Sequence, residues 1–380
     1  MNKKQVFSSI IKYPMVPLFF ALIITMLILY LVLPKNEFSD VENRKLQTMP
    51  EISLSSLADG SFMAKFETYT TEQLPFREVL VKIKALAKQL TLGNENNGIV
   101  KGKDGYLFEV SYGITPQYGK NVAAIKKFVS DADREVYIAI APTAPEIMRD
   151  SLPKGFKTID QKSELDKLGG ELSLIQNASY INLYDTISGH KTDGEQMYYR
   201  TDHHWTSEAA SYAYADITST ILNENHFNPD LLTPRRVNDF YGTHYAKFKE
   251  YNIKPDTMTY YDIPVESYAR SDGEYDSLYD YDKLNIYDKY AFFMRGNDDL
   301  AVVKSSNSGS GRSLIVIKDS YANCLIPYLT YDYDTITIVD LRYYSESVRE
   351  LLDSDKEADV LLLYNFDFIN EDNHFYRLTS

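Results

Sequence analysis

The sequence predicts an α/β fold with a largely parallel sheet. From about residue 99 onward, short runs of β-branched and aliphatic residues alternate with stretches of helical period, a pattern typical of a parallel sheet covered by helices. With 44% hydrophobic residues in 380, the chain can bury a full core, so we expect one main domain with appendages. The expected strands are Val136–Ala141, Tyr180–Leu183, Leu314–Ile317, Thr335–Val339 and Val360–Leu363.

The N-terminal region is expected to be a membrane anchor. Residues 15–33 are almost wholly apolar, and a helix of about 20 residues spans the ~30 Å hydrocarbon core of a bilayer. Basic residues precede this run and acidic residues follow it, so the positive-inside rule predicts a cytoplasmic N-terminus and an extracellular main domain. A cleavable signal peptide is the alternative, but the run is long for one and residues 32–35 offer no small-residue cleavage site. The flanking charges are Lys3, Lys4, Lys12, Glu37, Asp40 and Glu42.

Three segments are expected along the chain. Residues 1–34 form the cytoplasmic tail and anchor, residues 35–98 a stalk with a helical stretch interrupted at Pro75, and residues 99–380 the main domain. A segment near 235–300 is crowded with Tyr and Asp and weak in apolar periodicity, so it is interpreted as an insertion. Its tyrosines either pack on a neighbouring face, which is the commoner case, or stack on sugar rings.

Composition excludes several functions. The formal net charge is −14 and the basic residues are dispersed, which argues against a nucleic-acid partner. Cys324 is the single cysteine, so the chain has no internal disulfide, multi-cysteine zinc site or CxxC pair. No cofactor is expected.

Ser320 stands where a strand is predicted to turn into a helix. It follows the run 314–317 and precedes an expected helix reaching Leu329, so its hydroxyl should project from the carboxyl edge of the sheet. Helix N–H groups at such a turn can stabilise an oxyanion. A serine there is more often a helix cap, and a nucleophilic serine also needs a base and an acid that orients the base.

The segment Thr201-Asp202-His203-His204-Trp205 supplies a base and an acid. Asp202 and His204 are two residues apart, just before a helix that Thr206 can cap, so the carboxylate can orient the imidazole. We therefore predict a Ser320–His204–Asp202 triad, with the His203 side chain pointing away. A polar loop with surface histidines is one alternative. A metal site is another, but its further ligands, such as His190 or His244, have no recognisable spacing, so no metal is predicted.

Residues 202–205 match the name-giving motif of the DHHW proteins, which resemble the alginate O-acetyltransferase proteins of the SGNH hydrolase superfamily. The resemblance covers nearly everything after the anchor. It implies an SGNH-like three-layer sandwich in which Asp202, His204 and Ser320 form the triad. The further matching segments are Glu42-Asn43-Arg44, Gln73-Leu74-Pro75-Phe76-Arg77, Gly102-Lys103-Asp104-Gly105-Tyr106-Leu107-Phe108 and Asp340-Leu341-Arg342-Tyr343-Tyr344.

The chain departs from the superfamily in two respects. Lys318 stands where the first superfamily block has Gly, and the serine follows the Asp/His pair instead of preceding it. A circular permutation explains the second departure, because the cyclic order of the blocks is preserved. It puts Asn365 in the place of the oxyanion asparagine, and Asn297 is the rival candidate.

The resemblance implies a membrane-anchored O-acyltransferase, with acetyl as the expected group, that acts on a cell-surface or exported polysaccharide through an acyl-enzyme. Tyr321, Arg342 and Tyr343 are the candidates for substrate binding. A multi-span membrane O-acyltransferase is a partner implied by the resemblance alone. Two alternatives stay open: a glycan acetyl-esterase, and a non-catalytic glycan-binding subunit of an export machine.

Overall fold

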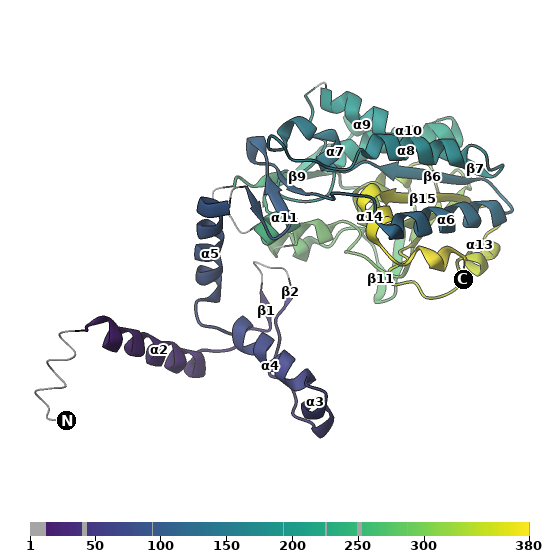
Figure 1. Cartoon of the computed structure of the whole chain (residues 1–380). Helices are drawn as coiled ribbons and strands as arrows, with labels where there is room; N and C mark the ends of the chain where they lie inside the picture. The colour runs from purple at the N-terminus through teal and green to yellow at the C-terminus, as the bar shows by residue number, and fades with distance from the viewer. Residues whose placement is uncertain are drawn as a thin grey trace, which may run out of the picture. The chain divides into compact units, whose positions relative to one another are not determined.

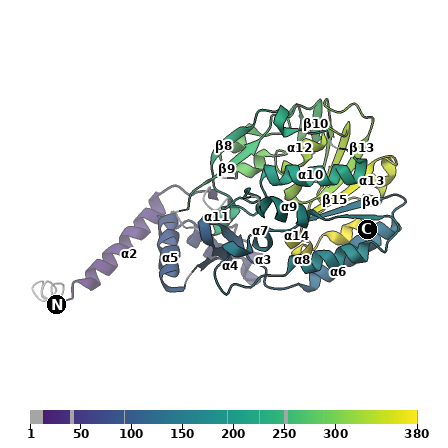
Figure 2. The ribbon, with the colours of Figure 1, turned by 90° about the horizontal axis from the view of Figure 1, so that it is seen from above.

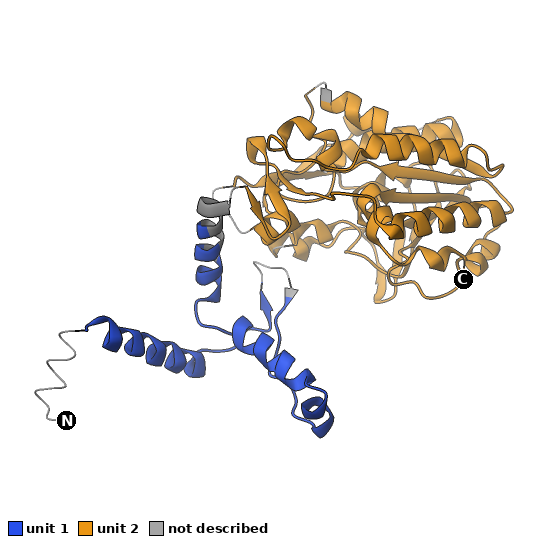
Figure 3. Cartoon of the chain, in the orientation of Figure 1, with its two compact units in different colours: residues 1–91 blue, residues 92–380 orange. Residues whose placement is uncertain are grey.

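The computed structural model describes residues 13–39, 44–92, 94–192, 194–224, 226–248, 253–286 and 288–379. The chain divides into two compact units, residues 1–91 and 92–380 (Figure 3). Lys3, Lys4, Lys12, Asp40 and Glu42, on which the expected membrane orientation depends, lie outside the described residues.

The first unit is mainly helical. Within the described residues, α2 (Met15–Val32) is the one helix long and apolar enough to cross a membrane. Its 18 residues give a length of about 27 Å at 1.5 Å per residue. Pro75 lies between two of the following helices, as predicted, because proline cannot donate the next helical hydrogen bond. The other elements are β1 (Phe38–Ser39), β2 (Arg44–Lys45), α3 (Leu54–Ala58), α4 (Ser61–Glu72) and α5 (Arg77–Leu92).

The second unit contains an eight-stranded sheet whose parallel part was predicted from the sequence. The five parallel strands lie in the order β14-β13-β15-β6-β7. Two have the predicted bounds and three differ from them by one or two residues. The strands are β6 (Val136–Ala141), β7 (Ala178–Ile181), β13 (Ser313–Lys318), β14 (Thr335–Val339) and β15 (Asp359–Asn365).

Three antiparallel strands that were not predicted extend the sheet beyond β14. They are β12 (Leu300–Lys304), β10 (Ser267–Arg270) and β11 (Gly273–Tyr275), in that spatial order. The Tyr/Asp-rich segment therefore adds strands to the main sheet. It also forms a separate antiparallel pair, β8 (Arg235–Phe240) with β9 (Asp256–Tyr260), and helix α11 (Thr243–Phe248).

Helices cover both faces of the sheet and make a three-layer unit. On β15, Leu362 packs into one core and Leu361 into the other, because successive side chains of a strand point to opposite faces. Figure 2 shows α6 and α8 on one side of β6 and β15 and α10 on the other. The helices are α6 (Pro116–Asp131), α7 (Ala144–Ile147), α8 (Gln161–Leu172), α9 (Leu183–Thr192), α10 (Ser207–Leu222), α12 (Ile326–Leu329), α13 (Val348–Ser354) and α14 (Phe366–Glu371), labelled in part in Figure 1.

Short elements complete the unit. A small antiparallel sheet consists of β3 (Glu95–Asn96), β4 (Ile99–Lys101) and β5 (Leu107–Glu109). The 3-10 turns are η1 (Lys103–Gly105), η2 (Arg149–Ser151), η3 (Pro229–Leu231), η4 (Tyr281–Asn285), η5 (Lys289–Phe292), η6 (Ser320–Cys324) and η7 (Phe375–Thr379).

Aromatic rings of the Tyr/Asp-rich segment pack against one another. The rings of Tyr279 and Phe292 stack with centroids 4.8 Å apart, and Tyr260 meets Phe292 edge-on at 4.6 Å. All three residues are buried. For these rings the structure favours packing over the sugar-stacking alternative.

Candidate active site

A pocket of about 500 Å³ opens at the carboxyl edge of the parallel strands. Four neighbouring strands, β14, β13, β15 and β6, each lead into it through the residues at or just after their carboxyl ends. These residues are Arg342, Ser320, Asn365 and Thr143 respectively. Polar groups from four segments of the chain therefore meet at one edge, which is where open α/β sheets bind ligands.

Asp319 fixes the turn that carries Ser320. Its Oδ1 accepts the N–H of Tyr321 at 2.8 Å, and its Oδ2 accepts both the backbone N–H and the side-chain Nδ2–H of Asn365, each at 2.7 Å. Burial raises the pKa of this carboxyl group to about 6. The expected helix after Ser320 is the 3-10 turn η6 followed by the four-residue α12, so a helix dipole contributes less here than the sequence suggested.

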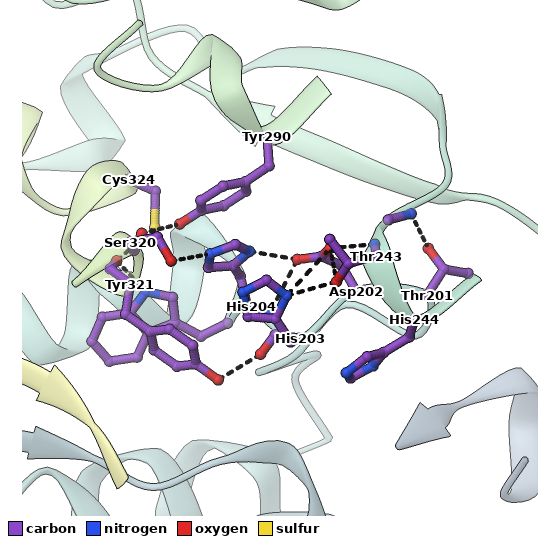
Figure 4. Close-up of polar contacts among 12 residues, drawn as sticks. Thr201, Asp202, His203, His204, Thr243, His244, Tyr290, Ser320, Tyr321 and Cys324 are labelled. Carbon is purple, nitrogen blue, oxygen red and sulfur yellow. Dashed lines mark hydrogen bonds and ion pairs between the residues drawn. The ribbon is translucent and has the colours of Figure 1, made fainter. Parts of the chain in front are cut away.

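Asp202, His204 and Ser320 form one continuous hydrogen-bonded chain (Figure 4). Nδ1 of His204 is 2.5 Å from Oδ1 of Asp202, and Nε2 of His204 is 2.8 Å from Oγ of Ser320. Asp202 and His204 are buried, whereas Ser320 is partly exposed in the pocket. The structure thus brings Ser320 to the Asp202/His204 pair, although 116 residues separate it from His204 in the sequence.

The charges in this chain suit proton transfer from the serine. Burial favours a neutral Asp202, but His203, His204 and hydrogen bonds outweigh it and hold the pKa of Asp202 well below its usual range. Thr243 contributes both its backbone N–H, at 2.8 Å, and its hydroxyl, at 3.1 Å. Burial lowers the pKa of His204 although Asp202 opposes that shift. His204 is therefore neutral at pH 7, donates from Nδ1 to the carboxylate, and can accept the Ser320 proton at Nε2.

The loop that carries Asp202 is held in place by a buried carboxylate and by a glycine. Asp256 accepts hydrogen bonds from the backbone N–H groups of Arg200, at 3.0 Å, and Thr201, at 2.8 Å. Gly242 lies against Asp202 so closely that a Cβ added at Gly242 would be 2.2 Å from the Cβ of Asp202. Only glycine fits at this position without displacing the loop.

Two reciprocal hydrogen bonds join the histidine loop to the serine turn. The indole N–H of Trp205 donates to the backbone oxygen of Tyr321 at 2.9 Å, and the hydroxyl of Tyr321 donates to the backbone oxygen of His203 at 2.5 Å. All the atoms involved are backbone atoms or buried aromatic polar groups. Tyr321, which was expected to bind substrate, lines the pocket and couples the two loops.

Tyr290 is a site residue that the sequence did not reveal. Its ring stacks on the imidazole of His204 with centroids 3.6 Å apart and planes 10° from parallel (Figure 4). The tyrosine comes from η5 in the Tyr/Asp-rich segment and is buried. One tyrosine among many in that segment gave no signal that would have distinguished it.

The orientation predicted for His203 is wrong. Its ring lies 3.8 Å from that of His204 and lines the pocket, because the two residues sit in a tight loop where consecutive side chains need not diverge. Asp202, His203 and His204 are close enough together to hold a metal ion. However, both ring nitrogens of His204 are in hydrogen bonds and Nδ1 of His203 contacts Oγ1 of Thr243 at 2.7 Å, so the arrangement suits proton transfer better than metal ligation.

The two oxyanion candidates have different positions. Asn365 lines the pocket, and its Oδ1 accepts the N–H of Phe368 at 2.9 Å while one amide hydrogen is directed at Asp319. Asn297 is not among the residues that line the pocket. Its Oδ1 accepts hydrogen bonds from Nζ of Lys318 and Nδ2 of Asn323, both at 3.1 Å.

Lys318 replaces the expected glycine with a buried cation. Asn323 accepts a second hydrogen bond from its Nζ at 2.7 Å, and Oδ2 of Asp340 is 4.0 Å away. Burial lowers the pKa of Lys318 to about 8. The side chain lies beneath the serine turn and is not among the residues that line the pocket.

Of the other two substrate-binding candidates, one reaches the pocket. Arg342 lines it and is fixed by Asp340, with Nε to Oδ1 at 2.9 Å and Nη2 to Oδ2 at 2.5 Å. Tyr343 is 54% exposed and is not part of the lining, because its side chain points outward at the turn after β14. The rest of the lining, which the sequence did not reveal, includes Glu109, Thr243, His244, Lys247, Asp367, Phe368, Glu371 and Asp372.

Solved structures share this fold. A DHHW family protein from Eubacterium siraeum DSM 15702 is similar with a TM-score of 0.62 at 22% identity, over 74% of this chain and 95% of that one. Bacillus cereus PatB1 with a sulfonyl adduct is similar with a TM-score of 0.59 at 17% identity, over 74% of this chain and 100% of that one. At these identities the likeness shows the fold alone. No curated protein matches the sequence.

The family model described as DHHW protein matches residues 99–339, which is more than half of the chain. The matched residues include the loop with Asp202 and His204 as well as Ser320. The chain belongs to the DHHW protein family, as its sequence predicted.

Proposed function

We propose that this chain is a serine-dependent O-acyltransferase that transfers an acyl group, expected to be acetyl, to a hydroxyl group of a cell-surface or exported polysaccharide. The observation that carries the proposal is the hydrogen-bonded chain from Asp202 through His204 to Ser320, which ends in a pocket at the carboxyl edge of the sheet. Nucleophile, base and orienting acid are the three groups that acyl transfer through a serine requires.

The reaction has two halves. In the first, Nε2 of His204 accepts the Ser320 proton as Oγ attacks the acyl carbon of the donor; the bond to the leaving group breaks, and His204 returns the proton to that group. In the second, His204 takes the proton of an acceptor hydroxyl, whose oxygen attacks the acyl carbon. The ester bond to Oγ then breaks and Ser320 regains its proton. Asp202 holds the ring and stabilises the imidazolium in both halves.

We assign oxyanion stabilisation to the backbone N–H of Ser320 and to Asn365. The Ser320 N–H has no acceptor within the described residues. Asn365 lines the pocket and uses one amide hydrogen for Asp319, which leaves the second for the substrate. Each such donor is worth about 10²–10³ in rate when it is aimed at the developing charge.

We also propose that the fold is an SGNH hydrolase-like sandwich with a circular permutation. β15, which carries Asn365 at its end, pairs with β6 from much earlier in the chain. If the order is taken as cyclic and started at Ser320, then Asn365, β6 and the Asp202/His204 loop follow in turn. This is the order of the blocks in the superfamily.

The apolar helix α2 indicates where in the cell the proposed reaction takes place. We propose that α2 spans the cell membrane, with residues 1–34 as tail and anchor, 35–98 as stalk and 99–380 as the extracellular catalytic domain. A site held at the membrane surface can receive an acyl group delivered through the bilayer, which is the role of the multi-span partner implied by the resemblance.

Mass spectrometry tests the proposal. The full chain, purified in detergent, is treated briefly with p-nitrophenyl acetate, and peptides are searched for an acetyl group on Ser320; Ser320→Ala is the control. A sulfonyl fluoride is a suitable second label, because PatB1, which shares this fold, was solved with a sulfonyl adduct. Label on Ser320 in the wild type alone is expected.

Adding acceptor oligosaccharides to the acetylated protein then distinguishes a transferase from an esterase and from a non-catalytic subunit. An acetyl group that moves from Ser320 to an added oligosaccharide identifies a transferase, and release only as acetate identifies an esterase. A chain that binds glycans but leaves Ser320 unlabelled by either reagent is the non-catalytic subunit.

A further inference from the structure

The basic side chains that line the pocket around Ser320 are already paired with carboxylates of the protein. Nζ of Lys247 is 2.6 Å from Oε1 of Glu109, and Arg342 is bound by Asp340 through two hydrogen bonds. Lys247 and Arg342 are the only basic side chains among the described residues that line the pocket, apart from its histidines. A carboxylate or phosphate on a ligand would have to compete with these existing partners.

Carboxylates on α14 and on the turn after it also line the pocket, and they have no lysine or arginine partner among the described residues. Glu371 accepts a hydrogen bond from the hydroxyl of Ser111 at 3.1 Å, and the nearest basic group to Asp372 is Nδ1 of His374, at 3.1 Å. Asp367 has one carboxyl oxygen, Oδ1, that is buried without a hydrogen-bond partner among the described residues. All three residues belong to α14 or to the turn after it, and this surface is called the α14 wall. Glu371 and Asp372 give the wall a negative charge, whereas burial raises the pKa of Asp367 to about 7.

A buried histidine supplies a further free acceptor. His244 lines the pocket, is 2% exposed, and donates from Nδ1 to the backbone oxygen of Leu107 at 2.9 Å. Its Nε2 is therefore an acceptor, and it has no hydrogen-bond partner within the described residues. Burial, reinforced by His203, lowers the pKa of His244 to about 4, so the ring stays neutral at pH 7. A buried acceptor is satisfied when a ligand brings a donor to it.

We propose that the acceptor is a glycan that carries hydroxyl or ammonium groups and no carboxylate or phosphate. This inference rests on the proposed function and names the substrate class of the same pocket. Sugar hydroxyls and ammonium groups supply the donors that Nε2 of His244 and Oδ1 of Asp367 lack, and an ammonium group is attracted by Glu371 and Asp372. A uronate chain such as alginate, which the family resemblance alone would suggest, would be repelled by the same wall.

Binding to the full-length Ser320→Ala variant in detergent tests the proposal without any chemistry. Oligosaccharides of equal length are compared by saturation-transfer NMR and calorimetry: N-acetylglucosamine oligomers, glucosamine oligomers and oligouronates. We expect the uronate to bind about tenfold more weakly than the other two, with the gap narrowing as salt screens the repulsion. Equal or tighter uronate binding, or binding of none of the three, overturns the proposal.

Charge-removing variants connect the preference to this wall. Glu371→Gln combined with Asp372→Asn should raise uronate affinity about fivefold or more relative to the neutral oligomer. Glu350→Gln removes a carboxylate at an exposed position of α13 outside the pocket, and it should leave that ratio unchanged. An unchanged ratio in the double variant contradicts the assignment.

His244→Phe tests the neutral part of the site. It should weaken binding of the N-acetylglucosamine oligomer several-fold, and unchanged affinity counts against the proposal. Acyl-enzyme formation on Ser320 is measured separately with p-nitrophenyl acetate and wild-type protein. If wild-type protein forms no acetyl-enzyme on Ser320, the proposed function is refuted. If it does, but the uronate binds as tightly as the other oligomers or more tightly, only the proposed substrate class is refuted.

Discussion

The ring of Tyr290 lies flat on the imidazole of His204, 3.6 Å away, and its hydroxyl donates to the backbone oxygen of Ser320 at 3.2 Å. One side chain therefore contacts the proposed base and the backbone of the proposed nucleophile. The stack restricts rotation of the imidazole, and the face of the aromatic ring favours the imidazolium that forms during acyl transfer.

Removing this ring should slow the acylation of Ser320. Tyr290→Leu is expected to lower kcat/KM for p-nitrophenyl acetate about tenfold, the effect of losing roughly 1.4 kcal/mol of transition-state stabilisation. Tyr290→Phe keeps the ring and loses only the hydrogen bond, so it should retain most activity. If the two variants lose equal activity, the hydroxyl and not the stack is what matters.

The two adjacent histidines should differ in their effect on acyl transfer. His204→Ala removes the proposed base and should lower the rate about 10²-fold or more. His203→Ala should cost much less, because neither ring nitrogen of His203 contacts the serine, although its ring lines the pocket. Single-turnover acetylation, followed by mass spectrometry, measures both; similar losses would point to a shared metal or to the wrong base.

Gly242→Ala should disturb Asp202 specifically. The new methyl group would overlap the Asp202 side chain, so the loop must shift and the hydrogen bond to His204 must lengthen. We expect a loss of at least about tenfold in kcat with little change in KM. Gly170→Ala is the matched control. Gly170 lies in α8, and a Cβ added there would have no atom within 4 Å, so this substitution should leave activity unchanged.

The dependence of activity on pH follows from the lowered pKa of His204. The ring must be neutral to accept a proton, and burial moves its pKa below the ordinary value of 6.5. Activity should therefore persist as the pH falls to 6.5 and decline only at lower pH. The measurement is kcat/KM against pH, with NMR titration of ¹³C-labelled histidine to assign the acid limb. A midpoint above 6.5 for His204 would falsify this prediction.

Topology can be tested on cells without their wall. Added protease should digest the chain after Pro34, because the domain is predicted to lie outside and α2 in the membrane. An epitope fused before Met1 should survive until the membrane is opened. The reverse pattern, protection of the domain in intact cells, would remove the cell-surface glycan from consideration.

The sequence predicted the parallel part of the sheet because its strands are short runs rich in β-branched and aliphatic residues, and β13, β15 and β6 are almost wholly buried. The three antiparallel strands, β10, β11 and β12, were not predicted. Each is short, and β10 and β11 lie in a segment crowded with Tyr and Asp. At the site, Asp202, His204 and Ser320 were accessible through local motifs. Tyr290 and His244 were not, since their roles depend on how the Tyr/Asp-rich segment folds back over the sheet. The direction of the His203 ring is set by the same tertiary packing.

The position of β15 has a consequence for synthesis. This strand lies between β13 and β6, so the sheet stays split until Asp359–Asn365 emerges, long after Val136–Ala141. The histidine loop and the serine turn belong to opposite sides of that gap, and such late, non-local pairing is slow. A nascent chain that stops before β15 has neither the partner of Asp319 nor a closed pocket, so the site cannot be assembled before β15 has been synthesised.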